Sequence, residues 1–183
     1  MTTLHVDSSI SGDNSASKAI SRSIVDRLSA GGGAGEVIVR DLVADPLPHL
    51  TFDAFADTSV LDEFLGADTV VIGAPMYNFT LSSQLKAWLD RILVAGKTFR
   101  YTENGPEGLA GGKRVIVALA RGGFYDAGSP ASALEHLETY LKGVFNFIGI
   151  EPEFVAADGL AVSPEQRETS LRQALGETVR LAA

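Results

Sequence analysis

The stretch that decides the fold is DTVVIGAPMYNFTLSSQLKAWLDRIL, which runs from Asp68 to Leu93. Residues 69–72 form an uninterrupted β-branched, largely apolar run, which is typical of a parallel strand buried on both faces. After a loop, large apolar side chains recur every three or four residues, at Leu81, Leu85, Trp88, Leu89, Ile92 and Leu93. That spacing predicts an amphipathic helix, so the stretch is one strand–loop–helix unit.

The same alternation of strand and helix continues on both sides of this unit. Strands are predicted at residues 4–6, 36–40, 68–73, 114–120 and 153–157. Helices are predicted at residues 15–30, 59–66 and 81–93, from Pro130 to Ile148 behind a Ser129 N-cap, and from Pro164 behind a capping box that begins at Ser163. Residues 98–113 are rich in turn formers and predict an excursion from the pattern.

Five strand–helix repeats predict a single α/β domain over residues 1–183. Alternation of this kind implies a parallel sheet covered by helices on both faces. With five strands we expect a flavodoxin-like three-layer sandwich of strand order 2-1-3-4-5, whose switch point lies between strands 1 and 3. Ligands of open α/β sheets bind at such a point, beyond the carboxyl ends of the strands.

The composition argues against several classes of function. The formal net charge is −8 and no basic cluster is present, so we expect no nucleic-acid partner. The chain has no cysteine, and its histidines, His5, His49 and His136, are not at metal-ligand spacing, so we expect no metal site. No apolar run approaches the roughly 18 residues of a membrane span, and the N-terminus lacks a signal-peptide pattern. We therefore expect a cytoplasmic protein with no membrane partner.

Three loops of unusual composition follow strands 1, 3 and 4, which are neighbours in the expected order. They are residues 8–17 (SSISGDNSAS), residues 75–79 (PMYNF) and residues 121–125 (RGGFY). The first loop offers serine hydroxyls and leads into a helix N-terminus, where free N–H groups favour an anion. Without a GxxxxGK[ST] or GxGxxG pattern, it suits a phosphate that is bound but not transferred, such as that of FMN. The alternative is that the serines only cap the helix.

The other two loops combine aromatic side chains with glycine. Met76, Tyr77 and Phe79 offer apolar surface suited to a flat ring, or else they pack as ordinary core residues under the loop. The two glycines of RGG let a ligand approach the backbone closely. Arg121 lies either near a ring that becomes anionic or in a surface ion pair, and its spacing does not decide between the two.

Several motifs together resemble one family. They are DSSI and SAS at residues 7–10 and 15–17, APMYNF at 74–79, TFRYTENGPEGL at 98–109, RGG at 121–123 and FIGI at 147–150. The chain is similar, nearly end to end, to the FMN-dependent NADH:azoreductases, which are also NAD(P)H:quinone oxidoreductases of flavodoxin-like fold. The resemblance implies a homodimer in which the active site lies at the interface and the partner chain helps to roof each FMN.

The resemblance also implies roles for individual residues. The FMN phosphate and ribityl chain are expected to contact Ser9, Ser15, Ala16 and Ser17. The isoalloxazine ring is expected to contact Pro75, Met76, Tyr77, Asn78 and Phe79, and its pyrimidine end Ala120, Arg121, Gly122 and Gly123. The substrate pocket is expected to include Tyr101, Phe124, Tyr125 and Phe147. The chain departs from the family at Ala120, where serine is common, and over residues 50–68, which are shorter than in enterobacterial members.

The implied reaction is a ping-pong transfer of two electrons. NADH or NADPH passes a hydride to N5 of the flavin and leaves, and a quinone or aromatic azo compound then takes its place and is reduced. Two such rounds supply the four electrons that cleave an azo bond to amines. FMN supplies the chemistry, so no catalytic acid or base is expected, and the backbone N–H groups of Asn78 and Gly122 tune the flavin. Two other functions stay open: an FMN-binding electron carrier without turnover of small substrates, and a phosphodiester hydrolase.

Overall fold

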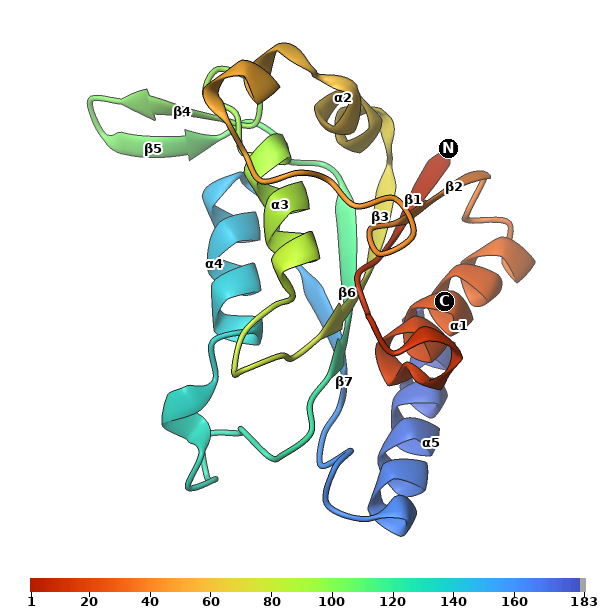
Figure 1. The fold of residues 1–183 in the computed structure, drawn as a ribbon. Coiled ribbons are helices and arrows are strands. Elements are labelled where there is room, and N and C mark those ends of the chain that lie inside the picture. The colour runs from red at the N-terminus through yellow and green to blue at the C-terminus, as the bar shows by residue number, and fades with distance from the viewer. Residues whose placement is uncertain (182–183) are drawn as a thin grey trace.

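The centre of the structure is one parallel sheet. The computed structural model describes residues 1–181 and has five strands side by side in the order β2-β1-β3-β6-β7 (Figure 1). These strands are β1 (Thr2–Asp7), β2 (Glu36–Asp41), β3 (Thr69–Pro75), β6 (Arg114–Ala120) and β7 (Glu153–Ala157). All their pairings are parallel, so the predicted five-stranded parallel sheet is confirmed.

Two further strands form a hairpin that the sequence pattern did not predict. β4 (Phe99–Thr102) and β5 (Gly105–Gly108) pair antiparallel within the expected irregular excursion. Because these strands intervene along the chain, the order is not strictly 2-1-3-4-5 when all strands are numbered: the five strands of the sheet follow one another as expected, but the last two are β6 and β7. The hairpin lies close to the segment after α4, since a Cβ on Gly108 would be 2.1 Å from the backbone N of Gly149.

Helices cover both faces of the sheet. On one face lie α1 (Ala16–Ala30) and α5 (Pro164–Leu181), and on the other α2 (Ser59–Gly66), α3 (Ser83–Ile92) and α4 (Glu138–Phe147) (Figure 1). Short 3-10 turns lie in the connections, at Gly12–Asn14, Phe52–Ala56 and Ser132–Leu134. The molecule therefore has the three layers expected of a flavodoxin-like fold. No helix among residues 1–181 is long and apolar enough to cross a membrane.

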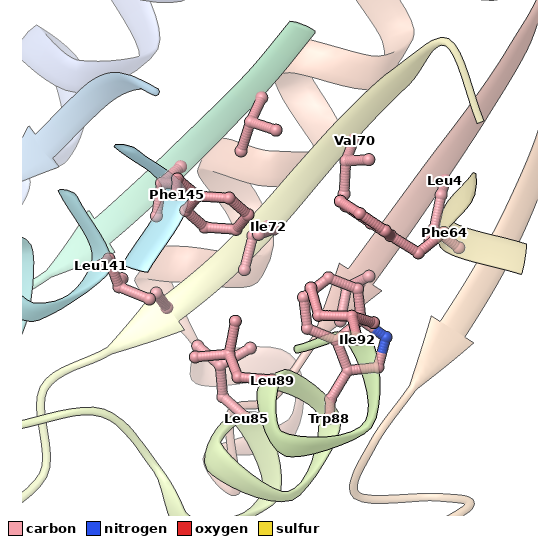
Figure 2. Packing of buried hydrophobic residues seen from close by; sticks show 14 of the residues in the cluster. Leu4, Phe64, Val70, Ile72, Leu85, Trp88, Leu89, Ile92, Leu141 and Phe145 are labelled. Atoms are coloured by element: carbon pink, nitrogen blue, oxygen red, sulfur yellow. The ribbon is translucent and has the colours of Figure 1, made fainter. Parts of the chain in front are cut away.

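The sheet divides the hydrophobic core into two clusters, and β3 contributes side chains to both. Val70 and Ile72 are buried toward α2, α3 and α4, whereas Val71 is buried toward α1 and α5. Successive side chains of a strand point to opposite faces, which explains why the whole run is β-branched and apolar. In the first cluster, Phe64 and Trp88 pack edge to face with 5.9 Å between ring centroids (Figure 2). Of the predicted apolar face, Leu85, Trp88, Leu89 and Ile92 are fully buried there, whereas Leu81 and Leu93 lie just outside α3 and are half-buried.

The start of α4 differs from the prediction. Ser129 does not cap this helix: its Oγ accepts a 3.0 Å hydrogen bond from the N–H of Ala131 and closes a local turn. The helix begins at Glu138, and the carboxylate of Glu135 accepts bonds of 2.8 to 3.0 Å from three N–H groups around the first turn. A Ser-Pro pair suits a turn as well as a helix start, which is why the sequence misplaced this boundary.

The carboxyl group of Glu135 also affects stability through its ionisation. Burial acts to raise its pKa, but the N–H donors of Thr139 and Glu138 outweigh burial and hold the pKa below its ordinary value of 4.5. A carboxyl whose pKa is lowered by folding stabilises the folded state above its unfolded pKa. That stabilisation is lost as the pH falls through the folded-state pKa.

Glu135→Gln should therefore destabilise the protein at neutral pH but not in acid. The carboxylate accepts N–H bonds at both of its oxygens, whereas glutamine, like a protonated carboxyl, is uncharged and has a single carbonyl oxygen. Bonds to a charged acceptor are stronger by about 1 kcal/mol. Urea unfolding should give a free-energy difference of about 1 kcal/mol near neutral pH, which closes once the pH is well below 4.5. Glu103→Gln, in the exposed hairpin turn, is the matched control and should change neither value. A difference that persists in acid would contradict the assignment.

Candidate functional site

The three unusual loops meet at one edge of the sheet. They follow β1, β3 and β6, which are neighbouring strands. The Oγ of Ser8 donates a 2.9 Å bond to the carbonyl of Gly73, and the N–H of Met76 donates a 2.9 Å bond to the carbonyl of Ala120. These bonds connect the end of β3 and its loop to the neighbouring segments on either side, so the three loops are held together.

The loop at residues 8–17, here termed the hydroxyl loop, buries its serines. Ser9, Ser15 and Ser17 are only 2%, 5% and 0% exposed. Ser15 caps α1, because its Oγ accepts a 3.1 Å bond from the N–H of Lys18, and this Oγ also lies 3.1 Å from that of Ser17. Capping of α1 is thus one role of the loop, but Ser9 and Ser17 are buried although neither side chain caps the helix.

A cavity of about 220 Å³, here termed the hydroxyl cavity, lies beside the N-terminus of α1. Its walls are formed by Ser9, Ser11, Asn14, Ser15, Ala16, Ser17, Pro75, Met76, Tyr77, Ala120, Gly122, Leu160, Ala161 and Arg167. No carboxylate is among these residues. Hydroxyls, a helix N-terminus and one guanidinium form a wall that suits an anion.

The loop after β3 contains a strained turn. Tyr77 and Thr80 exchange backbone hydrogen bonds of 2.9 and 3.1 Å, and the two residues between them, Asn78 and Phe79, have φ of 48° and 73°. Positive φ at both central positions defines a type I′ turn, which favours asparagine but costs an aromatic residue about 1 kcal/mol. Neither central N–H donates to another group within residues 1–181. The turn therefore presents two unused donors.

Tyr77 connects this turn to the hydroxyl loop. Its hydroxyl oxygen accepts a 3.1 Å bond from the N–H of Ile10 and lies 3.2 Å from the Oγ of Ser9. Together with Met76, it lines both the hydroxyl cavity and a second cavity of about 860 Å³, which extends past Asn78 along the start of α3. Two adjoining cavities leave room for a ligand much larger than a phosphate.

The loop after β6 pairs with the loop after β7. The N–H of Ala161 donates to the carbonyl of Gly122 at 2.9 Å, and the N–H of Gly159 donates to that of Gly123 at 3.0 Å. A Cβ on Gly123 would lie 3.3 Å from the ring of Tyr125, so the close approach there leaves little space for a side chain. Of the two glycines in RGG, Gly122 lines the hydroxyl cavity and Gly123 does not.

The side chain of Arg121 forms a buried ion pair. It is 7% exposed, donates bonds of 2.5 and 3.0 Å to the carboxylate of Asp158, and donates a third of 3.0 Å to Glu138. Burial acts to lower the pKa of Arg121, but these carboxylates raise it. Arg121 lines neither cavity, so of its two possible roles the geometry supports the ion pair.

The four aromatic residues expected around a substrate lie in two separate groups. Phe124 and Tyr125 belong to the loop after β6 and stay at the edge that carries the cavities. Tyr101 and Phe147 both pack on Phe99, with 5.6 and 4.7 Å between ring centroids, where the hairpin meets the end of α4. That region lies at the opposite end of the sheet (Figure 1). One chain therefore does not bring the two groups together.

Sequence reasoning missed the contribution of β7 and α5. Leu160 and Ala161 follow β7, Arg167 lies in the first turns of α5, and all three line the hydroxyl cavity. Because β7 lies next to β6, its carboxyl end reaches the same edge, and a basic residue early in the following helix was the available signal. Residues 1–181 contain no group of three or more side chains that could hold a metal ion.

Comparison with known proteins supports the flavodoxin-like fold. A family model described as the flavodoxin-like fold matches residues 1–181. The chain is 54% identical over 201 residues to FMN-dependent NADH:quinone oxidoreductase 2 of Bradyrhizobium diazoefficiens, with 100% of both chains covered. It is 51% identical over 195 residues to the FMN-dependent NADH:quinone oxidoreductase of Xanthomonas campestris, covering 95% of this chain and 96% of that protein.

Solved structures give the same relationship. The crystal structure of azoreductase AzrA superposes with a TM-score of 0.90 at 27% identity, covering 100% of this chain and 99% of that one. An FMN-dependent NADH-azoreductase from Bacillus anthracis, solved in complex with FMN, has a TM-score of 0.84 at 27% identity with both chains fully covered. The resemblance of the motifs is confirmed: this chain belongs to the flavodoxin-like family of the FMN-dependent NADH:quinone oxidoreductases.

Proposed function

We propose that this protein is an FMN-dependent oxidoreductase that transfers two electrons from NADH or NADPH to quinones and aromatic azo compounds. The observation that carries the proposal is the meeting of a hydroxyl-lined, carboxylate-free cavity with a strained turn that offers two free N–H donors. The names of the relatives, which specify FMN, NADH and quinone, and of the azoreductase structures support it. Its donors are cytoplasmic metabolites, and we propose that it acts in the cytoplasm.

The residues present fit FMN at its phosphate end. A phosphate monoester offers three strong acceptor oxygens and close to two negative charges at neutral pH. Ser9 and Ser17 supply hydroxyls at the hydroxyl cavity, and the backbone N–H groups of Ala16 and Ser17 have no acceptor within residues 1–181. Ser15, which holds the helix start in place, completes the expected set. We assign these four residues to the phosphate and the adjoining ribityl chain.

The second cavity and the two neighbouring loops fit the ring end of FMN. We assign residues 75–79 and residues 120–123 to the isoalloxazine, with the free N–H groups of Asn78 and Gly122 as donors to its polar edge. Met76 and Tyr77 provide apolar wall, and Ala120 contributes a methyl group where a serine would add a hydroxyl. For Arg121 only the backbone is assigned to this role.

The chain binds and orients, whereas FMN, when bound, supplies the reversible acceptance of a hydride and two electrons. No carboxylate or histidine lines either cavity, and the one lysine there, Lys86, is paired with Asp90. The protons that a reduced acceptor needs are expected to come from solvent. Fixed N–H donors instead stabilise negative charge on the ligand, a role that needs no proton transfer.

We also propose a homodimer with the active site at its interface. An apolar groove of about 450 Å³ is lined by Leu93, Thr139, Tyr140, Gly143, Val144 and Phe147. Tyr140 also lines the larger cavity, so a partner seated on the groove would cover that cavity as well. Tyr101, which is 75% exposed, would then reach the site of the other chain. This arrangement explains how two aromatic groups that are separate within one chain can enclose one substrate.

The purified protein should be yellow and should complete both halves of the reaction. Under anaerobic conditions NADH should bleach the flavin absorbance, and a benzoquinone should restore it. Steady-state rates should give the parallel double-reciprocal lines of ping-pong kinetics. Bleaching without multiple turnovers would favour the electron carrier. A colourless protein that neither binds FMN nor is stabilised by it would reject the proposal and revive the hydrolase.

Tyr101→Ala should raise the KM for quinones without changing the affinity for FMN. An aromatic contact is worth about 1 kcal/mol, so the KM should rise several-fold. Tyr101→Phe keeps the ring and is the matched control, and sedimentation should give a dimer for all three proteins. An unchanged KM in the alanine variant, or a monomer at assay concentrations, would contradict the shared active site.

A further inference from the structure

The hydroxyl cavity holds one charged side chain. Among its lining residues, Arg167 is the single ionisable group apart from the phenol of Tyr77. Its Nη2 donates a 2.6 Å bond to the backbone carbonyl of Asn14, which belongs to the hydroxyl loop. This bond spans 153 residues of sequence and holds the guanidinium of α5 against the loop that precedes α1.

Arg167 is not neutralised by the protein. Within residues 1–181 it forms no ion pair with a carboxylate, and its recorded side-chain bond is to a neutral carbonyl. The other cations near the site are already paired. Lys18, in the first turn of α1, donates to Asp41 at 2.6 Å, and Arg121 is bound by Asp158. Arg167 therefore supplies the unpaired positive charge of the cavity.

The position of Arg167 in its helix is unfavourable for stability. α5 begins at Pro164, and the N–H of Arg167 makes an early bond of the helix, to the carbonyl of Ser163 at 2.9 Å. A cation this near a helix N-terminus opposes the helix dipole, which favours negative charge there. An anion bound in the cavity would reverse this effect, because it would be attracted by the arginine and by the N-terminus of α1 together.

We infer that Arg167 is the phosphate-binding cation of the FMN site, acting from α5 alongside the hydroxyl loop. The inference rests on the proposed function, because it assumes that FMN is the ligand of this cavity. It adds a charged partner to a set that otherwise consists of hydroxyl and N–H donors. Arginine suits this role because its planar fork of N–H groups can donate to a phosphate while one group keeps its bond to Asn14.

The position of Arg167 predicts that it contacts the phosphate of FMN and not the ring or the ribityl chain. Riboflavin has the same ring and ribityl chain as FMN but no phosphate, so the contribution of Arg167 should appear in FMN binding alone. A charge-assisted bond typically contributes enough to change an affinity about tenfold or more. Because the contact is between charges, it should also weaken as salt is added.

The test compares both ligands on apoprotein from which FMN has been removed. Quenching of flavin fluorescence gives the Kd of FMN and of riboflavin for the wild type, Arg167→Gln and Arg167→Lys. We expect Arg167→Gln to raise the Kd of FMN about tenfold or more and to leave that of riboflavin unchanged. Arg167→Lys should recover part of the loss. Arg172→Gln is the matched control, since Arg172 lies on the exposed side of the same helix, paired with Glu168 at 2.8 Å.

Other outcomes separate this inference from the proposed function. If Arg167→Gln weakens both ligands equally, or weakens neither, the arginine does not bind the phosphate and the inference is overturned while FMN binding stands. If the wild type binds neither ligand, the proposed function itself fails. The melting temperature of each apoprotein is measured in parallel. We expect the melting temperature of Arg167→Gln to be at or above that of the wild type. A loss of FMN binding would then result from the lost contact with the phosphate and not from misfolding.

Discussion

A buried carboxylate fixes how α1 meets the sheet, and the site depends on that contact. Asp7 Oδ1 accepts a 3.0 Å bond from Ser21 Oγ, His5 Nε2 lies 2.9 Å from the same Oγ, and all three residues are at most 5% exposed. A Cβ on Gly73 would lie 2.5 Å from that carboxylate, so β3 needs glycine there. The polar cluster connects α1 to the end of β1, and it thereby sets the position of the helix N-terminus beside the hydroxyl cavity.

The strained turn is held by contacts from the other side of the site. The carbonyl of Phe79 accepts a 3.1 Å bond from the N–H of His136, and Thr80 Oγ1 donates a 3.0 Å bond to the carbonyl of the same histidine. A left-handed aromatic residue persists only where its surroundings determine its backbone. The segment before α4 does this, and it keeps the two free N–H groups of the turn oriented. Donors fixed in this way need no reorganisation when a ligand binds.

Short-range sequence patterns predicted the strands and helices whose residue types are dictated by burial. The β-branched run at residues 69–72 and the apolar face of α3 were predictable because burial dictates each residue. The hairpin was missed because β5 reads GPEG, a composition typical of turns. The serine and PMYNF loops were identifiable from composition and strand order. The ion pair of Arg121 with Asp158 and the bond of Arg167 to Asn14 could not be identified in this way. These bonds span 37 and 153 residues, so no periodic pattern in the sequence indicates them.

The distribution of charge explains how a protein of net charge −8 can hold an anionic cofactor. Salt screens exposed charges beyond roughly 8 Å at physiological ionic strength, so distant parts of the acidic surface have little influence inside the cavity. Two acidic side chains in the neighbouring segments are engaged with cations, Asp41 with Lys18 and Asp158 with Arg121. What remains at the cavity is positive: the N-terminus of α1 and Arg167. An overall acidic chain thus presents a local positive charge at the proposed FMN site, because its ion pairs leave one arginine free.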